Sequence, residues 1–470
     1  MNKFLLLTVS TACLTALAAN PSITNVRIAQ DAATRTVSVT YDLAGAPAVV
    51  TLDGVATNHA AMADGDILNV SGAANRLVPV GTDNVLRWLP PPSAGFGPFA
   101  AGAVSVSLKA WATNAPPDWM VIDLSVTNRV RYYATSNAIP GGISDTRYKT
   151  SYLVMRRIPA AGVVWRMGSP STEAEASEYR DNEHTHYVTL DEDYYIGIHP
   201  VTFRQFYYLN GNNDCDQKTN YTFTAIGGTD DDWPVAGIQY VCLRSWMHDQ
   251  RYGCTDNCGV YNNYWPRDGH AIDAAYTHKC LHTGGENEGA NLTYTPYLRR
   301  MRDKYGLEFD IPTDAQWEFA CRGGATEYES RYGDIDDIAW YAFNSSNETY
   351  NCCVPHPVGL KMPNGYGLYD MLGGIAELCL DFYVVSTNSV ETQVNPEGPS
   401  NVVNDRNASR VTRGGSFDAP AKCCRSAMRK SIGCTAADNF NFSAFGNDTA
   451  SPLRKQANGF RLWLPAHAAK

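Results

Sequence analysis

The stretch HPVGLKMPNGYGLYDMLGGIAELCLDFY, His356–Tyr383, is the most distinctive segment of this 470-residue chain. Its glycines do not form a phosphate-binding loop, because no strand-loop-helix unit with a lysine and no dinucleotide fingerprint surrounds them. We interpret Gly373 and Gly374, and likewise Gly414 and Gly415 further along the chain, as turn positions that need a positive φ angle. The stretch therefore predicts a fold of short strands and long loops.

A second stretch, RVTRGGSFDAPAKCCRSAMRK, Arg410–Lys430, carries two adjacent cysteines behind another Gly-Gly turn. Cys423 and Cys424 do not readily bridge each other, because neighbouring Cα atoms lie closer than disulfide geometry favours. Structural disulfides with distant partners are the favoured interpretation, and a reactive or metal-binding thiol is the alternative. The same two interpretations apply to Cys352 and Cys353.

The composition argues against a nucleic-acid partner. The chain has 38 Lys and Arg against 48 Asp and Glu, a net charge of -10, and its basic residues are scattered. With 44% hydrophobic residues, a chain of this length buries a sizeable core and should hold two or three domains. No stretch after the N-terminus reaches the roughly 18 to 20 apolar residues that a membrane span needs.

The first residues, MNKFLLLTVSTACLTALAAN, combine one lysine, an apolar run and a small-residue exit. This pattern is typical of a secretory signal peptide, so we expect residues 1–19 to be removed and the protein to be secreted, periplasmic or at the cell surface. Of the 13 cysteines, Cys13 alone lies in this segment. The rest fall between Cys215 and Cys434, and an even number in an exported chain favours disulfides.

Residues 20–133 have the pattern of a small all-β sandwich of the Ig-like kind. The runs TVSVTYDL, VSVSLKAW and VIDLSV alternate apolar and polar residues, with Val37, Val39, Tyr41 and Leu43 on one face. Period-two runs between Gly- and Pro-rich segments favour an antiparallel sandwich, which we expect to serve as a spacer or docking module. A polar linker should occupy residues 134–150, followed by a second domain at 151–470.

The second domain shows few helical patterns. PTDAQWEFACR, Pro312–Arg322, predicts a helix that starts at Thr313 and stops at the following glycines. PYLRRMRDKYG, Pro296–Gly306, predicts another. The remaining sequence predicts short strands and long loops. We therefore expect an α+β domain with little regular secondary structure, which disulfides or bound metal ions help to stabilise.

Three clusters carry both a metal-binding and a structural interpretation. CTDNC, Cys254–Cys258, could form half of a zinc site, but no second pair stands out, so disulfide closure is favoured. His184 and His186 alternate along an extended segment, as ligands or as ordinary strand residues. The run Asp230–Asp232 could attract Ca2+, although a solvated turn is the commoner outcome.

Six segments in register resemble the formylglycine-generating enzymes, or sulfatase-modifying-factor domains, from about Val164 to Leu464. They are RMGSPSTEAEASEYRDNEHTHYVTLDEDYYIGIHPVTFRQF, WPVAGIQYVCLRSW, IPTDAQWEFACRGG, the His356–Tyr383 stretch, RVTRGGSFDAPAKCCRSAMR and NGFRLWL. The resemblance implies a formylglycine-generating-enzyme-like domain, related in architecture to C-type lectins.

Active members of that family are oxidases that use O2 to convert a sulfatase cysteine to formylglycine. Two of their cysteines bind Cu(I), for which soft thiolates are suitable ligands. The resemblance puts these positions at Ala419 and Cys424, so the pair is incomplete here. It also implies a disulfide between Cys424 and Cys321. A rearranged copper site would then need Cys423 and a partner that the family does not supply, for which Cys434 is the candidate.

The resemblance also implies structural Ca2+. Glu377 keeps the place of a family ligand, whereas Gly374 stands where the family usually has asparagine and offers only its carbonyl. Asn344 is the candidate at a second structural calcium element. Ca2+ takes six to eight oxygen ligands, and we take Glu377, Gly374 and Asn344 as the candidate donors.

The segment CTAADNFNFSAFGNDTASPLRKQANG, Cys434–Gly459, mixes aromatic rings with amides and carboxylates. Such side chains suit a peptide, protein or carbohydrate ligand, because rings supply area and amides supply hydrogen bonds. The alternative is that the phenylalanines pack the loop down. The candidate binding residues are Asn439, Asn441, Phe442, Phe445 and Asn447.

The leading hypothesis is an exported, non-oxidase binding or scaffolding protein, because a two-thiolate copper site lacks its first sulfur at Ala419. The alternative is a copper- and O2-dependent oxidase acting on sulfatases with a pair drawn from Cys423, Cys424 and Cys434. A purely structural role is a third hypothesis.

Overall fold

The computed structural model describes residues 20–31, 33–57, 60–61, 70–90, 104–126, 130–173, 175, 182–210, 231–238, 240–244, 276–279, 291–294, 297–347, 352–384, 391–398, 409–433 and 457–466. The predicted signal peptide, the Cys254–Cys258 pair and the binding residues from Asn439 to Asn447 lie outside the described residues. The chain divides into two compact units, Met1–Thr113 and Asn114–Lys470.

The first unit is built from strands alone within its described residues. They are β1 (Ser22–Gln30), β2 (Val37–Ala44), β3 (Ala48–Thr57), β4 (Ala60–Ala61), β5 (Val70–Gly72), β6 (Arg76–Val78), β7 (Gly81–Trp88) and β8 (Val104–Ala112). One sheet has the order β1-β2-β7-β5, and a second has the order β4-β3-β6 with β8 also paired to β3. All these pairs are antiparallel.

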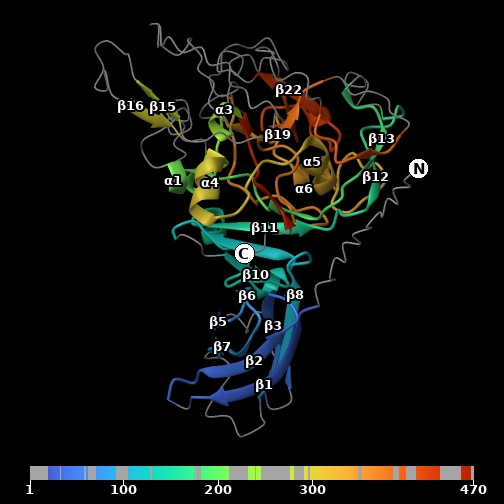
Figure 1. Ribbon diagram of the computed structural model, residues 1–470. Helices are drawn as coiled ribbons and strands as arrows, with labels where there is room; N and C mark the ends of the chain where they lie inside the picture. The colour runs from blue at the N-terminus through green and yellow to red at the C-terminus, as the bar shows by residue number, and fades with distance from the viewer. Residues whose placement is uncertain are drawn as a thin grey trace, which may run out of the picture. The chain divides into compact units, whose positions relative to one another are not determined.

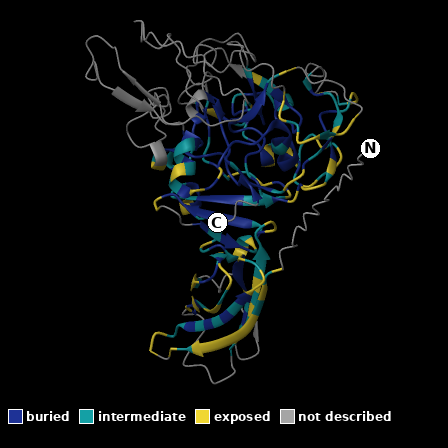
Figure 2. Ribbon diagram, viewed as in Figure 1, coloured by how far each residue is buried: buried dark blue, intermediate teal, exposed yellow. Residues whose placement is uncertain are grey.

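Residues of both sheets share one buried core. Val37, Val39, Tyr41 and Leu43 of β2 are all buried, and the residues between them are more exposed, as the alternating pattern predicts. Figure 2 shows this alternation along β2 beside the exposed strand β1. The same core takes in Val50 and Leu52 of β3, in the other sheet, so an apolar layer lies between the two sheets.

The boundary between the units lies earlier than the linker that we predicted at residues 134–150. VIDLSV belongs to the second unit, because β9 (Trp119–Asp123) pairs with both β10 (Val130–Tyr133) and β11 (Tyr152–Ile158). All five residues of β9 are buried. This strand therefore has no solvent-facing side, and the period-two interpretation that assigned it to the first unit was wrong.

Two sheets form the frame of the second unit. The first has the order β10-β9-β11-β14-β24, with β14 at Tyr194–Gly197 and β24 at Trp463–Pro465, so it joins both ends of the unit. The second has the order β22-β21-β19-β23 and holds the cysteine stretch. Its strands are β19 (Ala376–Phe382), β21 (Ser409–Arg413), β22 (Arg429–Gly433) and β23 (Asn458–Gly459).

The remaining elements of the second unit are short. A three-stranded sheet has the order β12-β13-β20, with β12 at Val164–Met167, β13 at His186–Thr189 and β20 at Gln393–Val394. The others are η3 (Ser136–Ala138), η4 (Thr146–Lys149), α1 (Phe203–Asn210), α3 (Tyr240–Leu243), β15 (Tyr276–Lys279), β16 (Asn291–Tyr294), α6 (Ile335–Ile338), β17 (Ser346–Asn347), β18 (Cys352–Cys353) and η8 (Ala421–Cys423). This content agrees with the predicted mixed domain of low regular structure.

Both predicted helices are present. α4 spans Tyr297–Tyr305 and is followed by Gly306 at a φ of 65°. α5 spans Asp314–Cys321, and Thr313 and Gln316 form a capping box at its start. α5 packs against β12, β19 and β21, so it lies beside the second sheet. Figure 1 shows α5 next to β19. Within the described ranges, no helix is long and apolar enough to cross a membrane.

Candidate functional site

The adjacent cysteines follow a tight turn at the end of β21. Gly414 and Gly415 have φ angles of 88° and 76°, which confirms the prediction of positive φ at this pair. A Cβ on Gly414 would lie 2.7 Å from the carbonyl oxygen of Met371, and a Cβ on Gly415 would lie 2.9 Å from Sγ of Cys424. Glycine is therefore needed at both positions for its conformation and for the close approach of the chain.

Ala419 lies at the first of the two positions where the resemblance implies a copper thiolate. It is 1% exposed and packs in a small apolar cluster with Cys423 and Met428. The adjoining cavity has a volume of about 20 Å3, roughly the space of one water molecule. A methyl group thus occupies the place of the first thiolate, and it offers no donor to a metal.

Cys424 lies at the second position, in the main core of the unit rather than at a surface. Burial raises the pKa of the Cys424 thiol to about 12, and burial likewise raises the pKa of Cys321. Both residues are free thiols, so the implied Cys321–Cys424 disulfide is absent from this structure. Sγ of Cys424 lies close to Gly415 of the Gly-Gly turn.

The small cavity beside Ala419 is not wholly apolar. Ser416 and Lys430 line it together with Ala419 and Cys423. Burial lowers the pKa of Lys430 to about 8, while the nearby groups Cys423 and Asp418 act in the opposite direction. The cavity therefore combines an amine of reduced basicity with a hydroxyl group, in a space too small for a substrate.

A buried network of arginines and carboxylates holds this turn in place. Arg413, the residue before Gly414, bonds Asp314 through Nε and Glu318 through Nη2, the latter at 2.8 Å. Arg429 bonds the other oxygen of Asp314 at 2.7 Å. Burial opposes charge on Asp314, but the two guanidinium groups outweigh it and lower the pKa of this carboxyl. The first turn of α5 is thus tied to β21 and β22.

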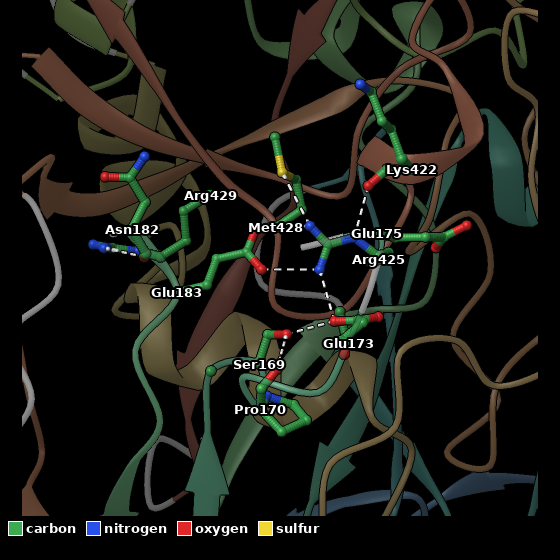
Figure 3. Close-up of polar contacts among 12 residues, drawn as sticks. Ser169, Pro170, Glu173, Glu175, Asn182, Glu183, Lys422, Arg425, Met428 and Arg429 are labelled. Carbon is green, nitrogen blue, oxygen red and sulfur yellow. Dashed lines mark hydrogen bonds and ion pairs between the residues drawn. The ribbon is translucent and has the colours of Figure 1, made fainter. Parts of the chain in front are cut away.

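Arg425, the residue after Cys424, forms a second buried centre. Its guanidinium makes a bidentate pair with Glu183, with both N–O distances at 2.9 Å, and a further bond of 3.0 Å to Glu173. Figure 3 shows Arg425 between the two carboxylates, with Ser169 bonded to Glu173. These contacts join the segment after β12 to the cysteine turn across more than 240 positions of sequence.

The three candidate calcium donors all serve other partners. Glu377 accepts bonds from Trp317 Nε1 at 2.7 Å and from Arg461 at 2.7 Å. The carbonyl of Gly374 accepts the Phe417 amide at 2.9 Å. The charge on Glu377 is thus balanced by a guanidinium, so these donors do not fit a cation site as they stand. The Ca2+ site stays a prediction.

Asn344 makes local contacts that stabilise the turn after α6. Its side-chain oxygen accepts the Tyr341 amide at 2.9 Å, and its amide donates to the Ala339 carbonyl at 3.0 Å. The structure describes no contact that brings Asn344 together with Glu377. The two elements proposed for calcium are therefore not joined in one site among the described residues.

His184 and His186 lie at the start of the β13 hairpin arm. Nδ1 of His186 lies 2.9 Å from the carbonyl oxygen of His184, so this ring is engaged with the main chain. Asp231 of the acidic run pairs with Arg204 at 2.7 Å, with both side chains more than a third exposed. These contacts agree with the structural interpretation of both clusters.

The buried charged residues are the part of the site that sequence reasoning missed. They are Glu183, Asp314, Glu318, Arg413, Arg425, Arg429 and Arg461. Their signal was present in the motif blocks, where arginine recurs in RGGS, CRSAMR and GFRL and acidic residues recur in PTDAQWEF. Charges inside otherwise apolar blocks are rarely buried unless they are paired, so they should have suggested internal ion pairs.

The chain is similar in sequence to several known proteins. The relatives include the formylglycine-generating enzyme of Thermomonospora curvata, 31% identical over 121 residues, which cover 23% of this chain and 38% of that protein. "Chaperone protein LppX" of Paenibacillus barcinonensis is 25% identical over 269 residues, 52% of this chain and 79% of its own. The match thus spans well under half of the length of the formylglycine-generating enzyme.

Among solved structures, "Treponema denticola variable protein 1" aligns over 67% of this chain and 95% of its own, with a TM-score of 0.39 and 23% identity. The family model of the sulfatase-modifying factor enzyme 1-like domain matches residues 155–442. This range includes the β12–β13 segment, α5 and the cysteine turn. The chain therefore belongs to the sulfatase-modifying factor enzyme 1-like domain family.

Proposed function

We propose that this chain is a non-oxidase member of its family, an exported binding or scaffolding protein that acts outside the cytoplasm. The observation that carries the proposal is the buried methyl group of Ala419 at the position where active relatives would hold the first copper thiolate. Two-coordinate Cu(I) needs two soft donors, and this position supplies none.

The second position supports the same conclusion. Burial raises the pKa of the Cys424 thiol to about 12, so the thiol is almost entirely protonated at pH 7. The thiolate is the form that binds metal and attacks other groups, so Cys424 is inert in the folded chain. An oxidase would have to form its pair from Cys423 and a partner such as Cys434.

The ligand-binding role is assigned to the segment from Cys434 to Gly459, most of which lies outside the described residues. Its aromatic and amide side chains, Asn439, Asn441, Phe442, Phe445 and Asn447, suit a peptide, protein or carbohydrate, in keeping with the C-type-lectin relationship that the resemblance implies. The strand-built first unit serves as the docking module. The signal-peptide pattern of residues 1–19 supports secretion or a periplasmic or cell-surface location.

A competition titration with a chromogenic Cu(I) chelator tests the copper part of the proposal. We expect reduced wild type and Cys424→Ser to withdraw equal amounts of copper, because residue 424 takes no part in any copper site. A tight site in wild type that Cys424→Ser abolishes would overturn the proposal.

Peptide and glycan arrays test the binding part. Phe442→Ala and Asn441→Ala should weaken binding of the ligands that the wild type selects, because a ring and an amide each contribute contacts in the proposed surface. If both variants bind every selected ligand as tightly as wild type, the segment is not the binding surface.

A further inference from the structure

A second cavity of the second unit lies away from the cysteine turn. It has a volume of about 400 Å3 and is enclosed by the β12–β13 segment, the first turn of α5, the end of β19 and residues 393–398. No residue that lines this cavity also lines the small cavity at Ala419. This cavity is therefore separate from the position at Ala419 where the resemblance implies a copper ligand.

Three of the carboxylates that line this cavity form buried ion pairs with arginine side chains. Asp314 is paired with Arg413 and Arg429. Glu318 is paired with Arg322 and Arg413 in the same network. Each of these charges has a guanidinium partner, so neither attracts a further cation strongly.

Glu183 at the same cavity is neutralised in the same way, by the bidentate pair with Arg425. Asp381, at the end of β19, differs from all three. It is 4% exposed and lines the cavity. Its Oδ2 accepts the backbone amide of Asp314 at 2.6 Å, and within the described part of the chain no arginine or lysine forms a salt bridge with it. Among these four buried carboxylates, Asp381 is therefore the one that no guanidinium pairs within the described residues.

The surroundings of Asp381 disfavour the ionised form of its carboxyl group. Burial, followed by the negative charge of Asp314, raises the pKa of Asp381 to about 7. Gly398, which also lines the cavity, lies close to this carboxyl group, since a Cβ on Gly398 would lie 3.3 Å from Oδ1. A buried carboxylate without a cation is destabilising, and a bound cation would relieve the cost.

We propose that this cavity binds an organic cation with N–H donors and a short aliphatic stem, of the kind found in alkylguanidinium and alkylammonium groups, with Asp381 as the counter-ion. The volume falls in the range of small-ligand pockets. Met167, Ala315, Phe382 and Val384 supply apolar wall for the stem, and Gln393 supplies an amide.

The arrangement favours an organic cation over a metal ion. Across the described residues, no group of three His, Cys, Asp or Glu side chains converges closely enough to hold a metal. A carboxylate with one open oxygen and apolar walls instead suits a cation that carries its own donors. An alkyl stem also gains from leaving water, which a hydrated metal ion does not.

The binding should depend on pH because it needs Asp381 in its ionised form. From pH 6 to pH 8 the ionised fraction of a group with a pKa near 7 rises about tenfold, and affinity should rise with it. The charges of neighbouring side chains also affect the ionisation of Asp381 and the electrostatic potential in the cavity. The titratable and charged groups around Asp381 are Glu183, His184, His186, Asp314, Glu318, Glu397, Arg410 and Arg429.

The test is isothermal titration of the full chain at pH 8 with n-butylguanidinium and n-butylammonium, with n-butylurea as the neutral isostere. We expect saturable one-to-one binding of at least one cation and none of the urea. Asp381→Asn should weaken binding at least about tenfold and flatten its dependence on pH between 6 and 8. Asp337→Asn removes the same charge from an exposed position on α6 and should leave binding unchanged.

If Asp381→Asn alters the fold, the variant Val384→Lys tests the same site. Val384 is 37% exposed at the rim, so Val384→Lys should fold, and its ammonium group should compete with the ligand for Asp381. Failure of both cations to bind would overturn the proposal. Equal binding by n-butylurea, or equal losses in Asp381→Asn and Asp337→Asn, would also overturn it.

A peptide with one internal arginine identifies the source of the cation. If it binds as tightly as n-butylguanidinium and loses affinity in Asp381→Asn, the cavity takes a side chain of a protein partner. If the free cations bind and the peptide does not, the cavity takes a small molecule. Both outcomes support the proposed chemistry of the site.

Discussion

Replacing Arg425 with methionine should remove the cation that balances a buried carboxylate. Arg425 and Glu183 are both fully buried as side chains, and the guanidinium bonds both oxygens of Glu183. Removal of one partner of such a pair leaves an uncompensated buried charge and costs about 3–5 kcal/mol. Glu173 contributes less to this cost, because it keeps Ser169 and Tyr328 as donors.

The loss should depend on pH. Burial raises the pKa of Glu183 even with Arg425 in place, and Arg425 is the main group that opposes this rise. Without it the pKa of folded Glu183 rises further above that of the unfolded chain. A carboxyl of this kind favours folding when protonated, so stability falls as pH rises through the folded-state pKa. The cost of Arg425→Met should therefore be larger at pH 8 than at pH 5.

Urea denaturation of the full chain at both pH values measures the effect. Arg204→Met is the matched control, because the Arg204–Asp231 pair is 38% and 39% exposed and should contribute no more than about 1 kcal/mol. The double variant Arg425→Met/Glu183→Leu should recover most of the lost stability, since it buries no charge. A loss in Arg425→Met no larger than in the control, or a double variant as unstable as the single one, would refute the reasoning.

Three further outcomes follow from the same structure. Because the pKa of Asp381 is raised to about 7 in the folded chain, wild type should lose stability relative to Asp381→Asn as pH rises from about 4 to 7, by ~2–4 kcal/mol, and urea denaturation across this range checks it. Gly414→Ala should destabilise more than Gly142→Ala, since both have positive φ but a Cβ at Gly142 meets nothing within 4 Å; melting temperatures of the two variants decide. Cys321 and Cys424 should resist alkylation in the native protein and react after denaturation, as peptide mapping by mass spectrometry would show; rapid labelling of native Cys424 would contradict its burial.

Local signals in the sequence predicted the parts of the fold that local chemistry determines. The capped start of α5 at Thr313 and the glycine that follows α4 at Gly306 lie where the sequence placed them. The alternation along β2 also appears as expected. Each of these features depends on residues within one turn or one strand of each other, so a single sequence contains the information.

The sequence did not predict contacts between distant segments. VIDLSV has the pattern of a half-exposed strand, but β9 is paired on both sides and buried on both faces. The Cys321–Cys424 disulfide that the resemblance implied is absent, and spacing along the chain does not determine such a pairing. The pairing of Arg425 with Glu183 joins residues 242 positions apart, and the cavity at Asp381 is assembled from segments that lie between Met167 and Arg429 in the sequence.

The central claim is that the chain does not carry out the oxidase reaction of its active relatives. Its most direct test is incubation of reduced protein, one equivalent of Cu(I) and O2 with a peptide that carries the sulfatase-motif cysteine, followed by mass spectrometry of the peptide. We predict no conversion to formylglycine above a copper-only control, because Ala419 supplies no thiolate and Cys424 is buried in its protonated form. Conversion that is lost in Cys424→Ser or Cys423→Ser would contradict the account.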